Sequence, residues 1–391
     1  MWCLSGKAAV LAAVYACAAC VRAAPQVELP VAARTDDVDS DWTAVVYNAR
    51  NPILVGNDGG ASSGGFRTFE LDGQSPIPES KHETPGRTKL VTTVYDIGGK
   101  DLLVTIAQTD SLFRLYDAST VEKVGEPLRE TLGDWSALCA WKSQSSGEQY
   151  LYLFGKHQAI QFLLREQEGS LDITEIQTFK VPVEASSCAV SLSTPSVFFS
   201  GDDDSTIYVF KATESTVGPN ITHLGDVDDD ITGLATYIGH GSDYLAVAQK
   251  DVLSIYDISF KALGSLKLTG DEDIEAKGLS FYQGPISNYS AGVLAYAIES
   301  KEGTGFAVSS LATAFKTLGL TVNTAYNPKK LPCDPVTTVC SECSNNGFCG
   351  SSSRYSGRAK CTVCHRFRLL CHHCISIIHF YTLQTPGRNN N

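Results

Sequence analysis

Two groups of closely spaced aspartates are the residues of this chain with the clearest capacity for chemistry. They are Asp202, Asp203 and Asp204, and the loop that contains Asp226, Asp228, Asp229 and Asp230. Calcium takes roughly six to eight oxygen ligands and carboxylates supply them, so such groups predict a cation-binding face. A solvated turn is the alternative interpretation of the second group, because runs of charge usually lie in solvent.

The overall charge restricts the ligands that this chain can bind. Its 391 residues carry a formal net charge of −12. Nucleic-acid binding needs clustered Lys and Arg to contact phosphates, and the sequence lacks such clusters. The glycine-rich stretch from Gly59 to Gly65 also lacks the Lys-Ser or Lys-Thr ending of a phosphate-binding loop. The composition therefore favours a cation over a nucleic acid.

The scaffold for these loops is predicted from short β-rich runs between Trp42 and Leu320. Gly, Asp, Asn and Ser separate runs such as 43–47, 66–71, 101–107 and 206–210. No stretch of this length shows a convincing helical period. Many strands without helical crossovers predict a sandwich, a barrel or a propeller.

A recurring strand ending distinguishes between these architectures. A strand that ends in an aromatic residue followed by an acidic or polar turn returns around Tyr116, Tyr208 and Tyr256. The intervals are about 45 to 95 residues, which is one to two blades of a propeller. A β-sandwich would need fewer strands than the chain offers. The predicted fold class is therefore all-β, and a propeller is favoured over a sandwich or a barrel.

Five sequence landmarks follow one another along the chain. They are Asp41-Trp42-Thr43-Ala44-Val45, Phe69-Glu70-Leu71-Asp72-Gly73, Leu153-Phe154-Gly155-Lys156, Ser200-Gly201-Asp202-Asp203-Asp204 and Asp230-Ile231-Thr232-Gly233-Leu234. In these landmarks and in their order, residues 36–320 resemble the β-propeller phytases. The resemblance implies a six-bladed β-propeller with an acidic, calcium-binding face. It also implies a secreted phosphomonoesterase that hydrolyses phytate, myo-inositol hexakisphosphate, with calcium assistance.

The resemblance further implies a role for each matching residue. Lys156, Asp202 and Asp230 are the expected catalytic residues, and Lys156 and Gln249 are expected to bind the phosphorylated substrate. The expected calcium ligands are Asp41, Asp202, Asp203, Asp230 and Glu275. Bound calcium would screen the phosphate charge and lower the pKa of a water that attacks phosphorus in line.

Several positions depart from the family pattern and remove carboxylates from the implied calcium site. Ser186 and Thr232 stand where the family has glutamates, and Trp42 replaces a second aspartate. His157 also replaces a glutamate, and Lys277 reverses the charge of an aspartate. Fewer carboxylates weaken calcium binding, and a lysine adds repulsion. The second hypothesis is therefore a non-catalytic propeller that binds a partner or an anion through the same acidic face.

The first residues predict export from the cell. Lys7 supplies a positive start, 8–19 is an apolar run, and Ala23 ends a small-residue cleavage pattern. A membrane anchor is the alternative, but the run is shorter than the roughly 20 apolar residues that a span needs. The sequons Asn220-Ile-Thr222 and Asn288-Tyr-Ser290 are compatible with export. We expect a signal peptide over 1–23, a secreted propeller domain over 24–320, a linker over 321–332, a cysteine-rich segment over 333–391 and no transmembrane segment.

The 13 cysteines are distributed unevenly. Three lie in the predicted signal, Cys139 and Cys188 lie in the body, and eight lie between Cys333 and Cys374. Crowded cysteines in a short secreted segment usually form a disulfide framework. Cys139 and Cys188 either pair across successive blades or remain buried free thiols, and their spacing leaves both interpretations open.

The tail begins like an epidermal-growth-factor-like module, which would make it a contact site for a protein partner. Its opening runs from Cys333 to Cys349 and ends in Asn345-Asn346-Gly347-Phe348-Cys349. The expected ending is replaced by Cys361-Thr-Val-Cys364-His365 and Cys371-His372-His373-Cys374. The interpretation that we favour is a wrongly translated stretch from Arg366 onward. A broken disulfide module is the second interpretation. A zinc site comes last, because oxidised cysteines bind zinc poorly.

Overall fold

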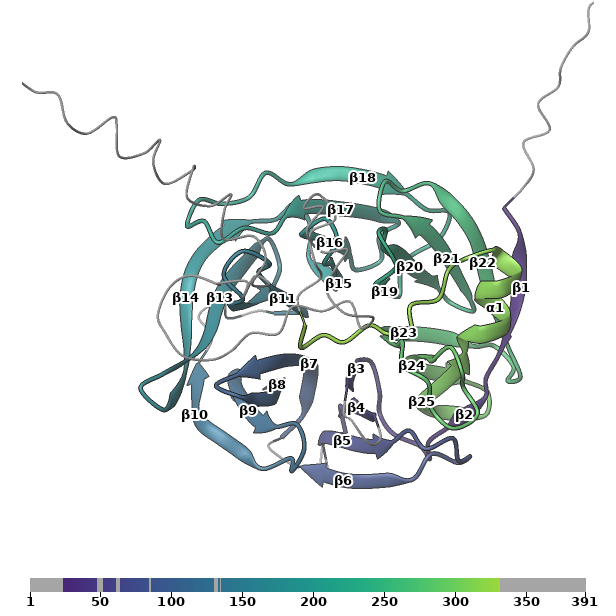
Figure 1. Cartoon of the computed structure of the whole chain (residues 1–391), viewed down its shortest axis with the longest axis horizontal. Coiled ribbons are helices and arrows are strands. Elements are labelled where there is room, and N and C mark those ends of the chain that lie inside the picture. The colour runs from purple at the N-terminus through teal and green to yellow at the C-terminus, as the bar shows by residue number, and fades with distance from the viewer. Residues whose placement is uncertain are drawn as a thin grey trace, which may run out of the picture.

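The computed structural model describes residues 24–47, 52–60, 64–83, 86–129, 133 and 135–330. Its strands form six antiparallel sheets of four strands around one axis, and one sheet gains a fifth, parallel strand (Figure 1). The predicted six-bladed β-propeller is therefore confirmed. The predicted signal peptide and the cysteine-rich tail, with its disulfide, zinc and partner predictions, lie outside the described residues. Within those ranges no helix is long and apolar enough to cross a membrane.

Blades 1 to 4 each consist of four consecutive strands, ordered from the axis outward. Blade 1 contains β3 (Thr43–Val46), β4 (Ile53–Asp58), β5 (Gly65–Glu70) and β6 (Glu79–Glu83). Blade 2 contains β7 (Thr88–Ile97), β8 (Lys100–Ala107), β9 (Leu112–Asp117) and β10 (Lys123–Arg129). Blade 3 contains β11 (Ala137–Lys142), β12 (Gln149–Phe154), β13 (Gln158–Gln167) and β14 (Ser170–Lys180). Blade 4 contains β15 (Ala185–Ser191), β16 (Ser196–Gly201), β17 (Thr206–Lys211) and β18 (Thr222–Asp226).

Blades 5 and 6 both recruit a strand from the beginning of the chain. Blade 5 contains β19 (Gly233–Tyr237), β20 (Tyr244–Gln249), β21 (Val252–Asp257) and β22 (Ala262–Thr269), with β1 (Gln26–Pro30) added parallel to β22. Blade 6 contains β23 (Glu275–Tyr282), β24 (Val293–Ser300) and β25 (Gly303–Ser310), with β2 (Ala33–Arg34) as its outer strand. Backbone hydrogen bonds between distant segments of the chain therefore close the ring.

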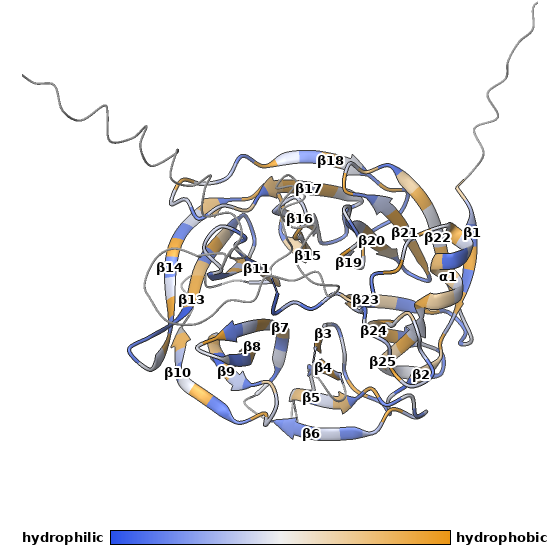
Figure 2. Ribbon diagram, in the orientation of Figure 1, coloured by the Kyte–Doolittle hydropathy of each residue, from blue (hydrophilic) through white to orange (hydrophobic). Residues whose placement is uncertain are grey.

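Alternation along the strands sends one set of side chains to each neighbouring blade. In β12, Leu151 and Leu153 pack in the core between blades 2 and 3, whereas Tyr152 and Phe154 pack between blades 3 and 4. Successive side chains of a strand point to opposite faces of its sheet. An inner strand is therefore buried on both faces, which explains its nearly continuous apolar sequence. Figure 2 shows this as hydrophobic inner strands, with more hydrophilic residues on the outer strands β6 and β18.

The recurring aromatic strand endings mark equivalent places in three blades. Tyr116, Tyr208 and Tyr256 lie on the third strands β9, β17 and β21. Tyr116 packs edge-on against Phe66 of blade 1, with ring centroids 4.9 Å apart. Tyr208 stacks on Phe199 of its own blade at 5.4 Å. The prediction of a blade repeat from these residues is therefore confirmed.

The ring has two faces, which we name from the direction of its innermost strands. The upper face is the one at which the innermost strand of each blade begins, and the lower face is the one at which it ends. Because the four strands of a blade are antiparallel, the loop between its second and third strands also lies at the upper face. The loops between the first and second strands, and between the third and fourth, lie at the lower face.

A short helix departs from the all-β pattern. Helix α1 (Leu311–Leu318) follows β25 at the lower face, and its residues Leu311, Ala314 and Phe315 are buried. The spacing of these residues is helical, but two turns are too short to stand out as a period in the sequence. Gly319 ends the helix in the left-handed conformation, with φ 70°.

Residues 320–330 lie across the lower mouth of the central channel (Figure 1). The backbone N–H of Asn323 donates to the hydroxyl of Tyr237 at 2.7 Å. The ring of Tyr326 meets that of Tyr47 edge-on, with centroids 5.4 Å apart. This segment therefore packs on the ring, and Tyr326 and Pro328 line the channel from below.

Candidate functional site

All seven residues predicted to form the site lie at the upper face. Asp41 and Asp230 precede the innermost strands β3 and β19, and Glu275 begins the innermost strand β23. Lys156, Asp202 and Asp203 lie in loops between second and third strands, and Gln249 ends the second strand β20. The fold therefore gathers residues from blades 1, 3, 4, 5 and 6 on one face.

Asp41 is positioned by a buried side chain that the sequence did not single out. The side-chain Oδ1 of Asn57 accepts hydrogen bonds from the backbone N–H groups of Asp41 at 2.8 Å and Trp42 at 2.7 Å. Asn57 is fully buried at the end of β4, and its own N–H donates to the carbonyl of Trp42 at 3.1 Å. The one sequence signal for this role is that Asn57 is a polar residue directly after the apolar run of β4.

Trp42 lies at the upper mouth of the central channel. Its half-buried side chain packs against the cores between blades 1 and 2, blades 2 and 3, and blades 3 and 4. It also lines the channel from above. At Gly278 an added Cβ would lie 2.6 Å from the Cα of Trp42, so the backbones of blades 1 and 6 touch here. The position at which the phytase resemblance implies a carboxylate is thus occupied by a packing residue.

Lys156 lies at the junction of blades 3 and 4. Its Nζ is 3.8 Å from Oε2 of Glu184, and the side chain of Lys156 is 66% exposed. The carbonyl of Glu184 in turn accepts the backbone N–H of Asp202 at 3.0 Å. Ser186, which replaces a glutamate, donates from its hydroxyl to the carbonyl of Gly201 at 2.8 Å. The structure therefore brings Lys156, Glu184 and Asp202 together, with Ser186 engaged by the backbone.

Four of the predicted metal ligands present exposed carboxylates. They are Asp41, Asp202, Asp203 and Asp230. Among the described residues, none of these four carboxylates makes a hydrogen bond or an ion pair. Asp203 has φ 49°, a left-handed conformation that Asp tolerates better than most residues. These oxygens are therefore available to a ligand from solvent.

The loops of blade 5 use the predicted residue Gln249 and the replaced position Thr232 for internal contacts. Gln249 donates from Nε2 to the carbonyl of Asp229 at 3.0 Å, which ties the end of β20 to the acidic loop. Thr232 donates from its hydroxyl to the carbonyl of Ala276 at 2.6 Å, which ties blade 5 to blade 6. Replacing a glutamate by Thr232 therefore exchanges a potential ligand for a contact between blades.

Glu275 is neutralised by the lysine that follows it two residues later. The Nζ of Lys277 lies 3.0 Å from Glu275 and 3.3 Å from Glu299. Partial burial opposes the charged form of Lys277, but the hydrogen bonds and charges of Glu275 and Glu299 outweigh it and raise the pKa of Lys277. The lysine therefore stays charged at neutral pH and occupies the place between two carboxylates.

The donor chemistry of this face suits calcium, but the implied site is not assembled. Exposed carboxylate oxygens are the ligands that calcium prefers. In the part of the chain that the structure describes, however, no three His, Cys, Asp or Glu side chains come close enough to hold a metal ion. The predicted ligands therefore share a face without forming a closed ligand set.

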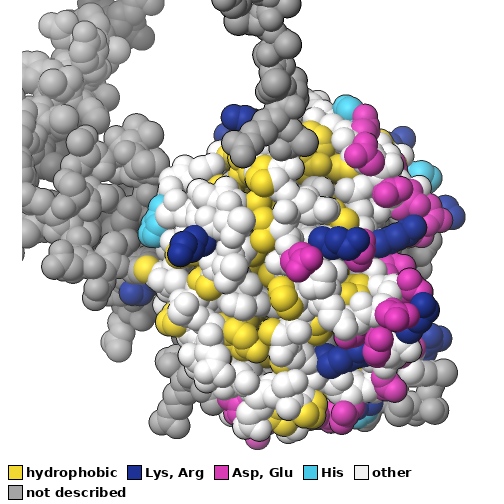
Figure 3. Space-filling view, turned by 90° about the vertical axis from the view of Figure 1, so that its right-hand side faces the viewer, with side chains coloured by type: hydrophobic (Ala, Val, Ile, Leu, Met, Phe, Trp, Pro, Cys, Tyr) yellow, Lys and Arg dark blue, Asp and Glu magenta, His cyan; other side chains and the backbone are white. Residues whose placement is uncertain are grey.

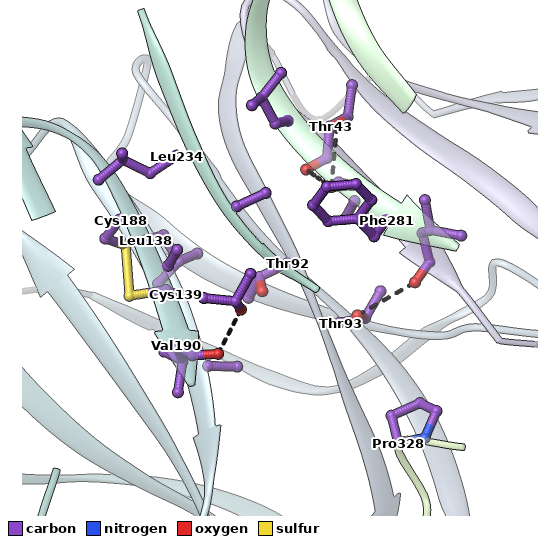
Figure 4. Close-up of a pocket in the computed structure, with 18 of the residues that line it drawn as sticks. Thr43, Thr92, Thr93, Leu138, Cys139, Cys188, Val190, Leu234, Phe281 and Pro328 are labelled. Atoms are coloured by element: carbon purple, nitrogen blue, oxygen red, sulfur yellow. Dashed lines mark hydrogen bonds between the residues drawn. A yellow bond between two sulfur atoms is a disulfide. The ribbon is translucent and has the colours of Figure 1, made fainter. Parts of the chain in front are cut away.

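The central channel contains a cavity of about 230 Å³ below Trp42. Threonine hydroxyls on its wall bridge neighbouring blades: Thr43 donates to the carbonyl of Gly278, and Thr236 to that of Val190 at 2.6 Å. Figure 4 shows this wall, with Thr43 and Phe281 on one side and Val190 on the other.

A disulfide on the same wall joins the innermost strands of two blades. Cys139 on β11 bonds to Cys188 on β15 (Figure 4). The sequence left a disulfide and two free thiols as equal alternatives, and the structure shows the disulfide. It connects blade 3, which carries Lys156, to blade 4, which carries Asp202.

Charged side chains gather along one edge of the molecule on the side of β1, β22 and α1 (Figure 3). On blade 6, Lys301 pairs with Glu272 at 2.9 Å and with Asp273 at 3.0 Å. Arg34 pairs with Asp271 in the same region. These loops precede β23 or connect β24 to β25, so they belong to the upper face. In blade 6, the three consecutive acidic residues Asp271, Glu272 and Asp273 are therefore each paired with a base.

No protein-family model matches the sequence, and no curated protein matches it. Among solved structures, the chain is similar to regucalcin from Agrobacterium tumefaciens, a calcium-binding protein, with 13% identity, a TM-score of 0.49 and coverage of 73% of this chain and 95% of that one. A luciferin-regenerating enzyme matches with 10% identity, a TM-score of 0.45 and coverage of 71% and 92%. A gluconolactonase from Xanthomonas campestris matches with 13% identity, a TM-score of 0.47 and coverage of 71% and 87%. At these TM-scores the similarities carry no argument about function, and the resemblance to phytases stays a resemblance.

Proposed function

We propose that this chain is a secreted, calcium-assisted phosphomonoesterase of the phytase type that acts at the upper face. Its substrate is phytate or another small molecule with several phosphate groups. The proposed catalytic residues are Lys156, Asp202 and Asp230, and Gln249 joins Lys156 in binding substrate. The observation that supports this proposal is that all seven predicted residues share the upper face of one ring.

The chain's own residues have the properties that this reaction needs. Lys156 presents an exposed ammonium group, and its ion pair with Glu184 spans 3.8 Å at the surface. Such exposed pairs contribute about 1 kcal/mol or less, so the several charges of a polyphosphate can displace Glu184. Asp202 and Asp230 offer exposed carboxylates that can orient a water or hold a cation. Calcium, when bound, would screen the phosphate charge and lower the pKa of that water.

A second candidate function is a non-catalytic binding propeller that uses the same face. The observation that favours it is the internal use of replaced positions: Lys277 binds Glu275 and Glu299, and Thr232 binds the carbonyl of Ala276. Each such contact removes a ligand from an incoming cation. In this case the cysteine-rich tail would add contacts to a protein partner.

Phosphate release from myo-inositol hexakisphosphate separates the two candidates. The full chain is assayed with calcium and with a chelator, beside Asp202→Ala and Asp230→Ala. Asp172→Ala is the matched control, because this aspartate is 45% exposed near the lower face on β14. We expect calcium-dependent release that both upper-face substitutions reduce at least about tenfold, a loss of about 1.4 kcal/mol of transition-state stabilisation. The control is expected to retain full activity.

The opposite result has an equally definite meaning. If the wild-type chain releases no more phosphate than Asp202→Ala does, both with calcium and with the chelator, the proposed phosphomonoesterase activity is excluded. The thermal midpoint then tests the remaining candidate, since a ligand that binds only the native state stabilises it by about 2.7 kcal/mol at a hundredfold excess over Kd. An unchanged midpoint in millimolar calcium supports a binding module that does not use the metal.

A further inference from the structure

Two exposed asparagines on the lower face have the sequence and geometry of glycan attachment sites. We propose that Asn220 and Asn288 each carry an N-linked glycan. This inference rests on the proposed secretion and is independent of the proposed catalysis. Both residues belong to Asn-x-Ser/Thr sequons, and residues 24–330 contain no other.

Asn220 lies in the loop between β17 and β18, at the lower face of blade 4. Asn220 and Thr222 are exposed, whereas Ile221 between them packs against the core shared by blades 3 and 4. Alternate side chains of an extended segment point in opposite directions, so burying Ile221 turns the other two outward. The hydroxyl of Thr222 donates to the carbonyl of Val209 at 3.3 Å, which fixes this segment against β17.

Asn288 repeats the same arrangement on blade 6. It lies in the lower-face loop between β23 and β24, in a tight turn in which Ile286 and Tyr289 exchange backbone hydrogen bonds of 3.1 and 2.5 Å. Tyr289 is partly buried against the core of blades 1 and 6. Asn288 and Ser290 on either side of Tyr289 are exposed. Both sequons therefore pack the partly buried middle residue against a core and present the asparagine to solvent.

The side-chain amides of Asn220 and Asn288 are also available for modification. Among the described residues, neither side chain makes a hydrogen bond or an ion pair, so a glycan on Nδ2 displaces no contact of the fold. In the transfer, Nδ2 loses a proton and bonds to C1 of an oligosaccharide held on a lipid pyrophosphate. The bond from C1 to the pyrophosphate oxygen breaks, and the lipid pyrophosphate leaves. The bulky, hydrophilic product is compatible only with an exposed position.

The position of the two sites has a functional consequence. Both are at the lower face, whereas all seven candidate site residues are at the upper face. The glycans therefore shield the face that carries residues 320–330 and leave the candidate site open to its ligand.

The test is secretion of the full chain, with its own N-terminus, from a eukaryotic host. Digestion with peptide-N-glycosidase converts each glycosylated asparagine to aspartate, which mass spectrometry assigns by position. We expect conversion at 220 and 288, loss of one glycan in each of Asn220→Gln and Asn288→Gln, and loss of both in the double variant. Thr222→Ser should keep the glycan at Asn220, and Thr222→Ala should lose it. Asn327→Gln, outside any sequon, is the matched control and should change nothing.

Unmodified peptides at both positions would overturn the proposal, whether the chain is secreted or stays inside the cell. A glycan at one position alone would overturn it for the other. Phosphate release does not enter this readout, so failure of the proposed catalysis leaves the result interpretable. If the glycans are present, their enzymatic removal is expected to leave the binding of myo-inositol hexakisphosphate unchanged, because they lie on the opposite face.

Discussion

One carbonyl oxygen, Oδ1 of Asn57, holds the backbone of Trp42 and Asp41 where the upper face meets the channel. The oxygen accepts both N–H groups, at 2.7 and 2.8 Å, and Nδ2 of Asn57 donates to the carbonyl of Thr88 at 3.4 Å. The same side chain thereby links the first blade to the second. Both Trp42, which lines the channel, and Asp41, a predicted ligand, are held by this one side chain.

We predict that Asn57→Ala lowers the free energy of unfolding by about 1 to 3 kcal/mol, because it leaves two partly buried N–H groups without their acceptor and removes a fully buried side chain. Urea denaturation followed by tryptophan fluorescence measures this loss. Trp42 should also emit at longer wavelength as it becomes more exposed. Asn220→Ala, after removal of any glycan, is the control for an exposed asparagine. Equal stability of the two variants would contradict the role assigned to Asn57.

The disulfide between Cys139 and Cys188 closes a loop of 49 residues. In the chain-entropy account, a bridge of this length stabilises a protein by about 4 kcal/mol, mainly by restricting the unfolded chain. We predict that a reductant lowers the urea midpoint of the wild-type protein more than that of Cys139→Ala/Cys188→Ala, in which only the cysteines outside the propeller can respond. Equal alkylation of both cysteines in unreduced, denatured protein would show that the bond is absent.

The segment across the lower mouth should contribute to stability through Tyr326. Its ring packs on Tyr47, and truncating a packed aromatic side chain typically costs about 3 kcal/mol. We predict a loss of this size for Tyr326→Ala in urea denaturation. Val217→Ala is the control, since Val217 is 73% exposed and its truncation should change stability by less than about 0.5 kcal/mol. If Tyr326→Ala is as stable as Val217→Ala, the contact between Tyr326 and Tyr47 does not hold the segment 320–330 on the ring.

Glu214 should make stability depend on pH in the acid range. Partial burial opposes its ionisation, but hydrogen bonds from Ser143, Ser146 and Ser145 outweigh it and lower the pKa of Glu214 below its ordinary 4.5. A carboxyl with a lowered folded-state pKa stabilises the protein above its unfolded pKa, and this is lost as the pH falls through the folded value. We predict that wild type exceeds Glu214→Gln in thermal midpoint at about pH 6 and that the difference shrinks below about pH 4. A difference independent of pH would refute this assignment.

Lys277 should control how well the upper face binds calcium. Lys277→Asp removes the cation between Glu275 and Glu299 and adds an oxygen ligand, so like charges then repel in the absence of metal. We predict a lower thermal midpoint in chelator and a larger rise in millimolar calcium than in wild type. Lys277→Met is the control, because it removes both ion pairs without adding a ligand. A calcium response no larger than that of Lys277→Met would exclude a cation site at this position.

Much of this architecture follows from features local to each strand. The aromatic endings at Tyr116, Tyr208 and Tyr256 predicted a blade repeat, and all three lie on third strands. The turn at Asp202 and Asp203 follows an apolar strand, so it had to lie at a strand end. Alternation and turn chemistry depend on neighbours a few residues apart, which is why the sequence alone determined the all-β propeller and the surface position of its acidic loops.

Contacts between neighbouring strands and between blades were decided only by the tertiary structure. The sequence could not show that Lys277 on β23 would sit between Glu275 on the same strand and Glu299 on the neighbouring strand of its own blade. It also could not show that Trp42 would line the channel and contact the cores between three pairs of blades where a carboxylate was implied. Nor could it show that β1 would add a fifth strand to blade 5 and that β2 would complete blade 6. These outcomes depend on which strands become neighbours when the ring closes and on the register between them. Such long-range pairings are set by packing of the whole molecule, and the spacing of residues along the chain does not record them.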